Sequence, residues 1–366
     1  CWVESAFDDI TKGRGALVGG EQREHRADSL KLKRMRLAAG WTVSDFCSKA
    51  GIDKTTGAKV LRGDPVFLGT LVQVGKAFKV DNYLEILHPE ELLDLGVTPM
   101  VDNDRHVLEW EIDEYLTGWE KATNGLQYQL VRLNHRYLPS RKARGKCYEM
   151  RHLAHVDRER LTEHLRRHPD VCERIGDHSN IAKNLTATWV REQWWVLDQW
   201  EEGETLAQRL KDGSLNDYAL KVVMTGIAGG LHMLHQAGVI RRELAPRFIL
   251  LRESNDKPVL TDFELAKMLE GASSVSPEEW PDDLYRAEEV AGDAPIDERA
   301  DVYSWGRVFI HAACGELPGR GKESAVLEKC KLPDKVRSIL LDSLNVARSK
   351  RPRSMTSILE ALEGWR

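Results

Sequence analysis

The sequence is short of paired cysteines and of long apolar runs. Its six cysteines are scattered through 366 residues, and no two of them form a Cys-x-x-Cys pair. That spacing argues against a zinc site and against a framework of disulfides, and it favours a reducing compartment. No apolar run approaches the ~20 residues that a membrane-spanning helix needs. We therefore expect a cytoplasmic protein with no membrane partner.

A large excess of either charge is also missing, but the charge that is present is unevenly distributed. The formal net charge of −5 argues against a protein that coats nucleic acid along its whole length. Between Asp28 and Val80, however, ten lysines and arginines stand against four aspartates, a net charge of +6, so the rest of the chain carries −11. A compact basic segment on an acidic protein is the arrangement that contact with nucleic-acid phosphates requires.

Length and composition predict a multidomain protein, since 366 residues allow two or three domains. Residues 1–27 mix glycine with charge and carry few apolar positions, so we expect a poorly ordered leader. Residues 28–97 repeat apolar side chains at helical spacing, and the Pro- and Asp-containing stretch 98–106 is typical of a linker. Residues 107–200 and 201–366 form two further segments.

The basic segment contains short helices with recognisable ends. Polar N-caps and terminal glycines bound two of them: Thr42 with Gly51, and Asp53 with Gly63. Short helix, tight turn and short helix is the helix-turn-helix arrangement. The run from Leu32 to Phe78 is similar to the phage-repressor-like helix-turn-helix family, over about 50 residues of the chain.

The resemblance implies an all-α domain that binds duplex DNA. By the family pattern its third helix enters the major groove, with Lys54, Thr55, Thr56 and Lys59 on the exposed face. Gly57 departs from the pattern, because it stands mid-helix where an apolar residue is usual and lowers helix propensity by about 1 kcal/mol relative to Ala. The alternative is a module that only packs or dimerises, with its basic face solvated.

The stretch Gly238–Lys267 combines two short strand-like segments with two charged loops. The segments are Phe248–Leu251 and Pro258–Thr261, joined by a polar turn. Arg241-Arg242-Glu243 precedes the first segment, and Asp262-Phe263-Glu264 follows the second. Because the two loops lie at the same ends of paired strands, we expect them to point into one cleft.

This stretch resembles the catalytic core of the eukaryotic-type protein kinases, which reads His-Arg-Asp-Leu-x-Pro-x-Asn and then Asp-Phe-Gly. The framework positions match: Leu244, Pro246, Ile249, Leu250, Leu251, Asp262 and Phe263. The positions that carry the chemistry do not. Arg241 replaces the His, Glu243 the catalytic Asp, Phe248 the metal-binding Asn and Glu264 the Gly.

The resemblance implies an α+β, two-lobed domain behind the all-α one, with residues 107–200 as small lobe and 201–366 as large lobe. The loop that covers the phosphates would run between Gly118 and Gly125, which are two glycines where the family has three. On the third strand, Lys146–Leu153, Arg151 takes the place of the phosphate-holding lysine. Its partners on the following helix would be Glu159 or Glu163.

Other matched positions concern support and regulation. In the family an Asp, here Asp301, anchors the catalytic loop, and an Arg, here Arg351, pairs with the acid at Glu289. A phosphate on the activation segment would dock on an arginine cluster. The residues concerned are Arg241 and Arg242, with Ser273, Ser274 and Ser276 as phosphate acceptors.

The substitutions weaken every catalytic requirement. Phosphoryl transfer needs a metal held by an Asp and an Asn, and a base that accepts the hydroxyl proton. Phe248 cannot bind a metal, so Asp262 and Glu264 remain as ligands for Mg²⁺ or Mn²⁺. Glu243 is the candidate base, but its extra methylene shifts the carboxylate by about 1.5 Å. The nucleotide-binding candidates are then Arg151, Asp262, Gly118 and Gly125.

We interpret the chain as an intracellular regulatory protein that couples a DNA-binding helix-turn-helix to a pseudokinase-like signalling domain. Its partners would be duplex DNA and a protein partner or partner kinase. One alternative is an active atypical serine/threonine protein kinase that uses ATP with Mg²⁺ or Mn²⁺ and is targeted by its N-terminal module. A second alternative is a non-catalytic interaction scaffold that needs neither DNA nor a cofactor.

Overall fold

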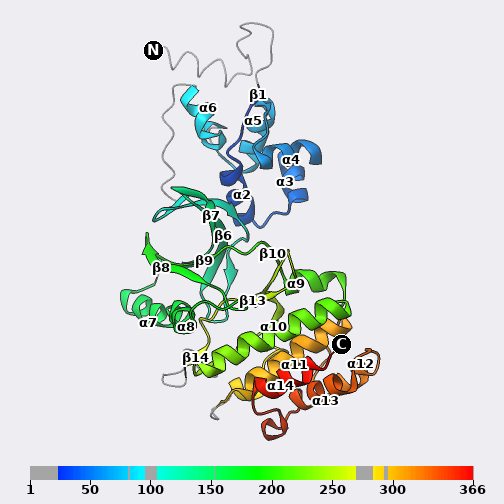
Figure 1. Cartoon of the computed structure of the whole chain (residues 1–366). Helices are drawn as coiled ribbons and strands as arrows, with labels where there is room; N and C mark the ends of the chain where they lie inside the picture. Colours follow the sequence, from blue (N-terminus) through cyan, green and yellow to red (C-terminus); the bar gives the residue numbers. More distant parts are fainter. Residues whose placement is uncertain are drawn as a thin grey trace, which may run out of the picture. The chain divides into compact units, whose positions relative to one another are not determined.

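A computed structural model describes residues 24–80, 83–94, 105–151, 153–268, 283–291 and 296–365. The chain divides into two compact units, Cys1–Asn103 and Asp104–Arg366 (Figure 1). Only residues 24–27 of the predicted leader and 105–106 of the predicted linker are among the described residues. Within that part of the chain, no helix is both long and apolar enough to cross a membrane.

The N-terminal unit is built from short helices, as its apolar spacing predicts. Its elements are β1 (Glu24–His25), α2 (Ser29–Ala38), α3 (Val43–Ala50), α4 (Lys54–Arg62), β2 (Val66–Phe67), α5 (Leu68–Ala77), a 3₁₀ helix (Tyr83–Ile86) and α6 (Pro89–Asp94). The two short strands pair antiparallel. Buried side chains from several helices form one core, among them Leu32, Phe46, Val60, Leu71 and Val74.

The predicted helix ends of this unit are confirmed by their hydrogen bonds. Thr42 and Asp45 form a capping box at the start of α3, and the Asp53 side chain accepts from the backbone N–H groups of the first turn of α4. Gly51 and Gly63 end the two helices in the left-handed conformation that glycine adopts without strain. These local signals fix the lengths of both helices.

Gly57 has a packing reason that the sequence pattern does not reveal. A Cβ atom placed on this residue would lie 2.3 Å from Cys47 Sγ of α3, well inside van der Waals contact. The glycine therefore allows α3 and α4 to approach closely, and this approach offsets its poor helix propensity of about 1 kcal/mol. An apolar side chain, which the family pattern favours here, does not fit.

The C-terminal unit begins with a small lobe built on an antiparallel sheet. Its strands are β3 (His106–Val107), β4 (Trp110–Tyr115), β5 (Glu120–Lys121), β6 (Gln127–His135), β7 (Leu138–Glu149), β8 (Asn184–Val190) and β9 (Gln193–Gln199). The order is β3-β4-β6-β7-β9-β8, with β5 paired to β6. Helices α7 (His155–Leu165) and α8 (Arg167–Ile175) connect β7 to β8.

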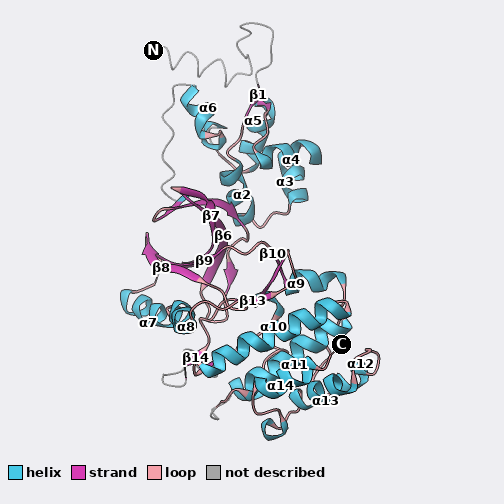
Figure 2. Ribbon diagram, in the orientation of Figure 1, coloured by secondary structure: helices cyan, strands magenta, loops and turns pink. Residues whose placement is uncertain are grey.

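The large lobe is mainly helical, and Figure 2 shows the contrast with the strand-rich small lobe. Its helices are α9 (Leu206–Arg209), α10 (Asp217–Gln236), α11 (Arg299–Cys314), α12 (Glu323–Leu327), α13 (Asp334–Ser343) and α14 (Met355–Glu363), with 3₁₀ turns at Leu210–Asp212, Pro246–Phe248, Glu288–Ala291 and Arg348–Lys350. Its strands are β10 (Gly203–Thr205), β11 (Val239–Ile240), β12 (Ile249–Arg252), β13 (Pro258–Leu260) and β14 (Lys267–Met268). The predicted hairpin is confirmed, because β12 and β13 pair antiparallel.

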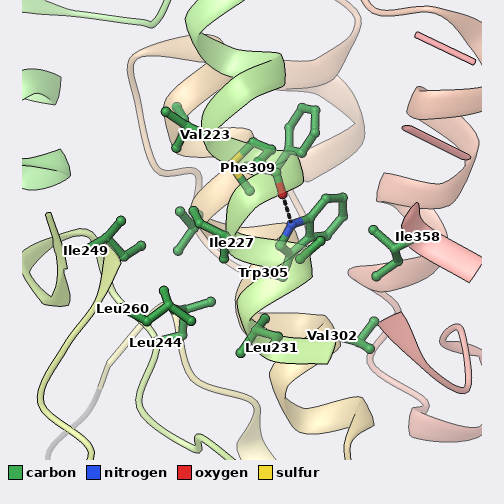
Figure 3. Close-up of a cluster of buried hydrophobic side chains, with 14 of the residues drawn as sticks. Val223, Ile227, Leu231, Leu244, Ile249, Leu260, Val302, Trp305, Phe309 and Ile358 are labelled. Carbon is green, nitrogen blue, oxygen red and sulfur yellow. Dashed lines mark hydrogen bonds between the residues drawn. The ribbon is translucent and has the colours of Figure 1, made fainter. Parts of the chain in front are cut away.

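The core of the large lobe forms where α10 crosses α11 and the β12–β13 hairpin (Figure 3). Trp305 of α11 is fully buried, and its indole N–H donates to the Met224 carbonyl of α10 at 3.1 Å. Burial of an aromatic side chain with its polar atom paired is strongly stabilising. The core therefore holds the hairpin, and the charged loops at its end, against two long helices.

The structure contains one disulfide bond that the cysteine spacing did not predict. Cys314, at the end of α11, forms a disulfide with Cys330, which follows α12. The two residues are 16 positions apart, and packing of α12 on α11 brings their Cα atoms to 6.2 Å. No local spacing signals this contact. Cys47, Cys147 and Cys172 are buried free thiols, as a sequence without paired cysteines predicts.

Candidate functional site

The buried carboxylate of Asp301 holds the loop between β11 and β12 in place. Asp301 of α11 accepts from the backbone N–H groups of Arg241 at 2.7 Å and Arg242 at 2.8 Å. His235 of α10 lies on the same carboxylate at 2.8 Å. Arg242 has a φ of +63°, a left-handed conformation that needs such support in a residue other than glycine. The predicted anchoring role of Asp301 is confirmed.

The side chain of Arg241 is buried, and it cross-links two loops instead of lying on the surface. Only 1% of the residue is exposed, and its guanidinium donates to the carbonyls of Asp262 at 2.7 Å and Thr261 at 2.5 Å. The same group lies 4.6 Å from the centre of the Phe263 ring. Burial lowers the pKa of Arg241, and nearby carboxylates oppose that effect. Arg241 therefore ties the two charged loops together, and the docking of a phosphate on it stays a prediction.

Arg242 is also turned inward. It is 3% exposed and donates from Nε to the Leu265 carbonyl at 2.8 Å. Burial and the neighbouring cation Arg167 lower its pKa to about 10. The predicted phosphate acceptors Ser273, Ser274 and Ser276 lie outside the described residues.

Asp262 is the centre of the cleft, and two cations hold it. Lys146 Nζ lies 2.5 Å from Oδ1, and Arg144 Nη2 lies 3.0 Å from Oδ2. The Thr261 hydroxyl also donates to Oδ2 at 2.5 Å. Burial alone would raise the pKa of Asp262, but Arg144 and Lys146 hold it well below its usual value. Asp262 is thus a fully paired carboxylate, held at a φ of +62°.

Glu264 also contacts Lys146 and therefore belongs to the same cluster. Its Oε1 lies 3.1 Å from Lys146 Nζ and accepts from the Tyr148 hydroxyl at 2.6 Å. The ammonium group also lies 4.7 Å from the ring centre of Tyr128 and 5.2 Å from that of Tyr148. Such positions over two aromatic faces stabilise a cation. Burial alone would lower the pKa of Lys146, but Asp262 and Glu264 raise it well above its usual value.

The sequence indicated Arg151 as the cation of the cleft, but the structure places Lys146 there. Arg144, Lys146 and Tyr148 alternate along β7 and so share the face that meets the large lobe. Arg151 lies beyond the end of β7, where its Nη2 is 2.5 Å from Glu149 Oε2. Burial would raise the pKa of Glu149, but hydrogen bonds from Arg151 and Gln193 lower it to about 2. The predicted strand Lys146–Leu153 was placed several residues too late.

Glu159 and Glu163, the predicted partners of Arg151, line a different cavity. That cavity has a volume of about 750 Å³ and lies between α7 and the β8–β9 turn. Glu159 is 3.6 Å from His155 on its own helix. Neither glutamate belongs to the Asp262 cluster.

Asp198 is a further buried carboxylate near the cleft cluster, and sequence reasoning missed it. Asp198 of β9 lies 3.9 Å from Arg144 Nη1 and accepts from Asn184 Nδ2 at 3.0 Å. His168 of α8 contacts it through Nε2 at 2.8 Å, while the Phe263 N–H donates to His168 Nδ1 at 3.1 Å. The ring therefore carries its proton on Nε2 and links α8, β9 and the loop after Asp262.

The loop between Gly118 and Gly125, which would cover a nucleotide, contacts Glu243 directly. Gly125, with a φ of +82°, allows the turn before β6, and the Thr123 hydroxyl donates to Glu243 Oε1 at 2.6 Å. Arg247 is 3.4 Å from the same oxygen. A cavity of about 740 Å³ remains beneath the loop, and Gly125, Glu243, Asp262 and Glu264 line it. The described lining does not include Gly118.

Comparisons with known proteins identify this architecture. The family model described as protein kinase domain matches residues 137–362, which is more than half of the chain. The chain belongs to the protein kinase family.

Several relatives are serine/threonine-protein kinases. Serine/threonine-protein kinase PknA of Nostoc sp. is 28% identical over 166 residues, covering 43% of this chain and 29% of the relative. Serine/threonine-protein kinase C of Synechocystis sp. is 29% identical over 167 residues, covering 43% and 31%. Serine/threonine-protein kinase 16 of Mus musculus is 27% identical over 302 residues, covering 73% and 93%. The chain thus spans about three tenths of the length of the two bacterial relatives.

Support positions of the kinase fold are retained here. Arg351 Nη1 lies 2.5 Å from Glu289 Oε1, which confirms the predicted pair. Arg351 also donates to the carbonyls of Arg299 and Asn345, so it connects the start of α11 with the segment before α14. These support contacts of the large lobe are kept, whereas the residues of the cleft differ from the family pattern.

The cleft does not fit the divalent metal that the kinase family implies. Phe248 brings a phenyl ring to the cavity in place of an oxygen ligand. The carboxylates of Asp262 and Glu264 already accept from Lys146, Arg144, Thr261 and Tyr148. Within the described ranges, no group of three or more His, Cys, Asp or Glu side chains is arranged to hold a metal ion.

In the N-terminal unit, the predicted DNA-contacting residues lie on one helix. Lys54, Thr55 and Lys59 are exposed on α4. Thr56 is half-buried, and its hydroxyl donates to Asp53 Oδ2 at 2.6 Å, so it serves the helix cap. Three of the four residues therefore form a polar, basic surface.

Proposed function

We propose that the chain is a regulatory protein whose kinase-family unit acts by binding partners, without efficient phosphoryl transfer, and whose N-terminal unit binds duplex DNA. The observation that carries the first part is the position of Lys146. Its ammonium group bridges Asp262 and Glu264 at 2.5 and 3.1 Å. The two carboxylates available as metal ligands are thus engaged by the protein itself.

The position of Glu243 supports the same proposal. A general base must lie within hydrogen-bond reach of the proton that it accepts. Glu243 is 7% exposed, and it accepts from Thr123 of the covering loop. A substrate hydroxyl therefore has to displace Thr123 and open the loop before it reaches this carboxylate.

The second candidate function is serine/threonine protein kinase activity, and the comparisons favour it. The relatives carry that name, and the family model covers residues 137–362, which include most of the large lobe. In addition, Glu243 and Asp262 line one cavity of about 740 Å³. In this reading Glu243 is the base, Asp262 and Glu264 hold Mg²⁺ or Mn²⁺, and ATP is the phosphate donor.

Transfer of radiolabelled phosphate from ATP separates the two candidates. The purified full chain is incubated with a generic protein substrate and Mg²⁺ or Mn²⁺, beside Glu243→Gln and Asp262→Asn. Glu253→Gln, in the exposed β12–β13 turn, is the matched control. We expect all four proteins to stay at the same background. Incorporation by the wild type and the control that both cleft variants lose would establish the kinase and overturn the proposal.

The DNA-binding part of the proposal rests on charge and exposure. The segment Asp28–Val80 carries +6, and Lys54 and Lys59 are exposed on the same helix. Lysines that contact phosphates release counterions from DNA, so binding should weaken steeply as salt increases.

A further inference from the structure

The cleft cluster contains four charged side chains in direct contact. Lys146 contacts Asp262 and Glu264, and Arg144 contacts Asp262. The formal charges of these four side chains sum to zero, and Asp198, 3.9 Å from Arg144, is also in contact with His168 at 2.8 Å. All four residues lie at the junction of β7 with the loop after β13, where the kinase family implies a divalent cation.

We propose that the Lys146 ammonium group is a resident cation that replaces the divalent metal, so that this cleft binds neither Mg²⁺ nor Mn²⁺. The inference rests on the proposed function because it concerns the same cleft. Its test, however, measures metal binding and not phosphate transfer.

Three of the carboxylate oxygens in the cluster already accept hydrogen bonds. Asp262 Oδ1 accepts from Lys146, Asp262 Oδ2 from Arg144 and Thr261, and Glu264 Oε1 from Lys146 and Tyr148. Mg²⁺ requires near-octahedral coordination at about 2.0–2.1 Å from each oxygen. An ion at that distance from both carboxylates would occupy the space of the Lys146 ammonium.

Charge balance points the same way. Lys146 and Arg144 neutralise Asp262 and Glu264, and all four are buried or nearly so. A divalent ion added to this set would place two further positive charges beside Lys146 and Arg144, and the repulsion between like charges opposes that. The metal can enter only if the lysine leaves.

The aromatic side chains favour the lysine over a metal. Tyr128 and Tyr148 present ring faces to Nζ at 4.7 and 5.2 Å from their centres. A ring face stabilises an ammonium cation but supplies no ligand oxygen. Mg²⁺ keeps several water molecules when it binds to proteins, whereas the Lys146 ammonium group is held here by direct contacts with both carboxylates and both rings.

The inference predicts that Lys146→Gln gains a binding site for a divalent metal ion. The neutral side chain leaves Asp262 and Glu264 with only Arg144 as a counter-charge, so a divalent ion restores the balance. Lys121→Gln is the matched control, because Lys121 is an exposed lysine that lines the same cavity. A double variant, Lys146→Gln with Glu264→Gln, should lose the gained site.

Mn²⁺ titration of the full chain, followed by the electron paramagnetic resonance signal of free Mn²⁺, tests the proposal. We expect the wild type, Asp262→Asn and Lys121→Gln to give the same curve, and Lys146→Gln to bind one additional Mn²⁺ per chain. Near-ultraviolet circular dichroism reports whether the variant is folded. A folded Lys146→Gln protein with no additional site would overturn the proposal.

The wild type provides a test that does not depend on the folding of Lys146→Gln. If the wild type binds one Mn²⁺ that Asp262→Asn loses, the lysine does not exclude the metal and the proposal fails. Metal binding without phosphate transfer would leave the proposed function standing and remove only this inference. Phosphate transfer by a wild type that binds no Mn²⁺ in the cleft would overturn the proposed function and leave this inference standing.

Discussion

Lys54 and Lys59 of the N-terminal unit and the charged side chains of the kinase-family cleft differ in exposure and in pairing. In the N-terminal unit, Lys54 and Lys59 are exposed on α4, and the apolar side chains are packed behind them. In the kinase-family unit, Lys146, Asp262 and Glu264 are buried and paired with one another. Exposed cations gain a counter-charge only from a partner, whereas the cleft charges already have theirs. The first arrangement is suited to a charged ligand, and the second is complete without one.

The largest expected effect concerns the exposed charges. Lys54→Glu with Lys59→Glu in the full chain should abolish binding to duplex DNA, because two phosphate contacts become repulsions. The salt dependence that remains should fall by roughly one unit of slope per contact. Fluorescence anisotropy with a labelled duplex at several salt concentrations measures both quantities.

The matched control reverses the same amount of charge elsewhere. Lys211→Glu with Lys331→Glu changes two exposed lysines of the kinase-family unit. This variant should bind DNA like the wild type. An equal loss in both double variants would show that only the total charge matters and would remove α4 from the interface.

The next effect concerns the buried charges. Lys146→Met should destabilise the kinase-family unit by about 3–5 kcal/mol, because it leaves two buried carboxylates with one counter-charge. Adding Glu264→Gln should recover part of that loss, since contacting residues do not contribute additively. Urea unfolding, followed by tryptophan fluorescence, measures both changes.

Lys121→Met is the control for this series, because Lys121 lines the same cavity but is exposed. It should change stability by less than about 0.5 kcal/mol. If Lys146→Met were equally mild, the cleft charges would not be interdependent.

A smaller effect separates packing from propensity in the N-terminal unit. Gly57→Ala should destabilise by about 1–3 kcal/mol, because its Cβ would overlap Cys47 Sγ. Gly69→Ala on α5 has open space at the Cβ position and should stabilise by about 0.4–1 kcal/mol. Thermal unfolding of the two variants should therefore shift in opposite directions, and a parallel upward shift would contradict the packing argument.

The smallest expected effect is a dependence on acid pH. The pKa of Asp262 in the folded state lies well below the usual 3.8. The stability that the ionised Asp262 carboxylate contributes is therefore present above pH 3.8 and is lost as the pH falls from there towards the folded-state pKa. The difference in urea midpoint between the wild type and Asp262→Asn should thus shrink between about pH 5 and about pH 3. A difference that stays constant across this range would mean that the low pKa of Asp262 does not contribute to folding.

Local signals in the sequence were sufficient for the helix ends and the hairpin. Thr42, Asp53 and Gly51 act within one turn of their own helices, so their roles can be derived without knowing the tertiary structure. The framework residues around Asp262 and the support by Asp301 also followed from the kinase pattern.

Contacts between distant segments were beyond a sequence argument. The lysine of the cleft was missed because the register of β7 against the large lobe decides that Lys146 faces Asp262. Gly57 depends on its distance from Cys47, and the Cys314–Cys330 disulfide depends on how α12 packs on α11. Each of these features is set by a neighbour that is remote along the chain or on another helix.

Thermal unfolding of the full chain with ATP, with and without Mg²⁺ or Mn²⁺, tests the central claim most directly. The claim is that the kinase-family cleft satisfies its charges internally. It predicts that adding the metal ion to ATP produces no further rise in the unfolding temperature of that unit. A metal-dependent rise that disappears in Asp262→Asn would contradict it, because a ligand that binds only the folded state must stabilise that state.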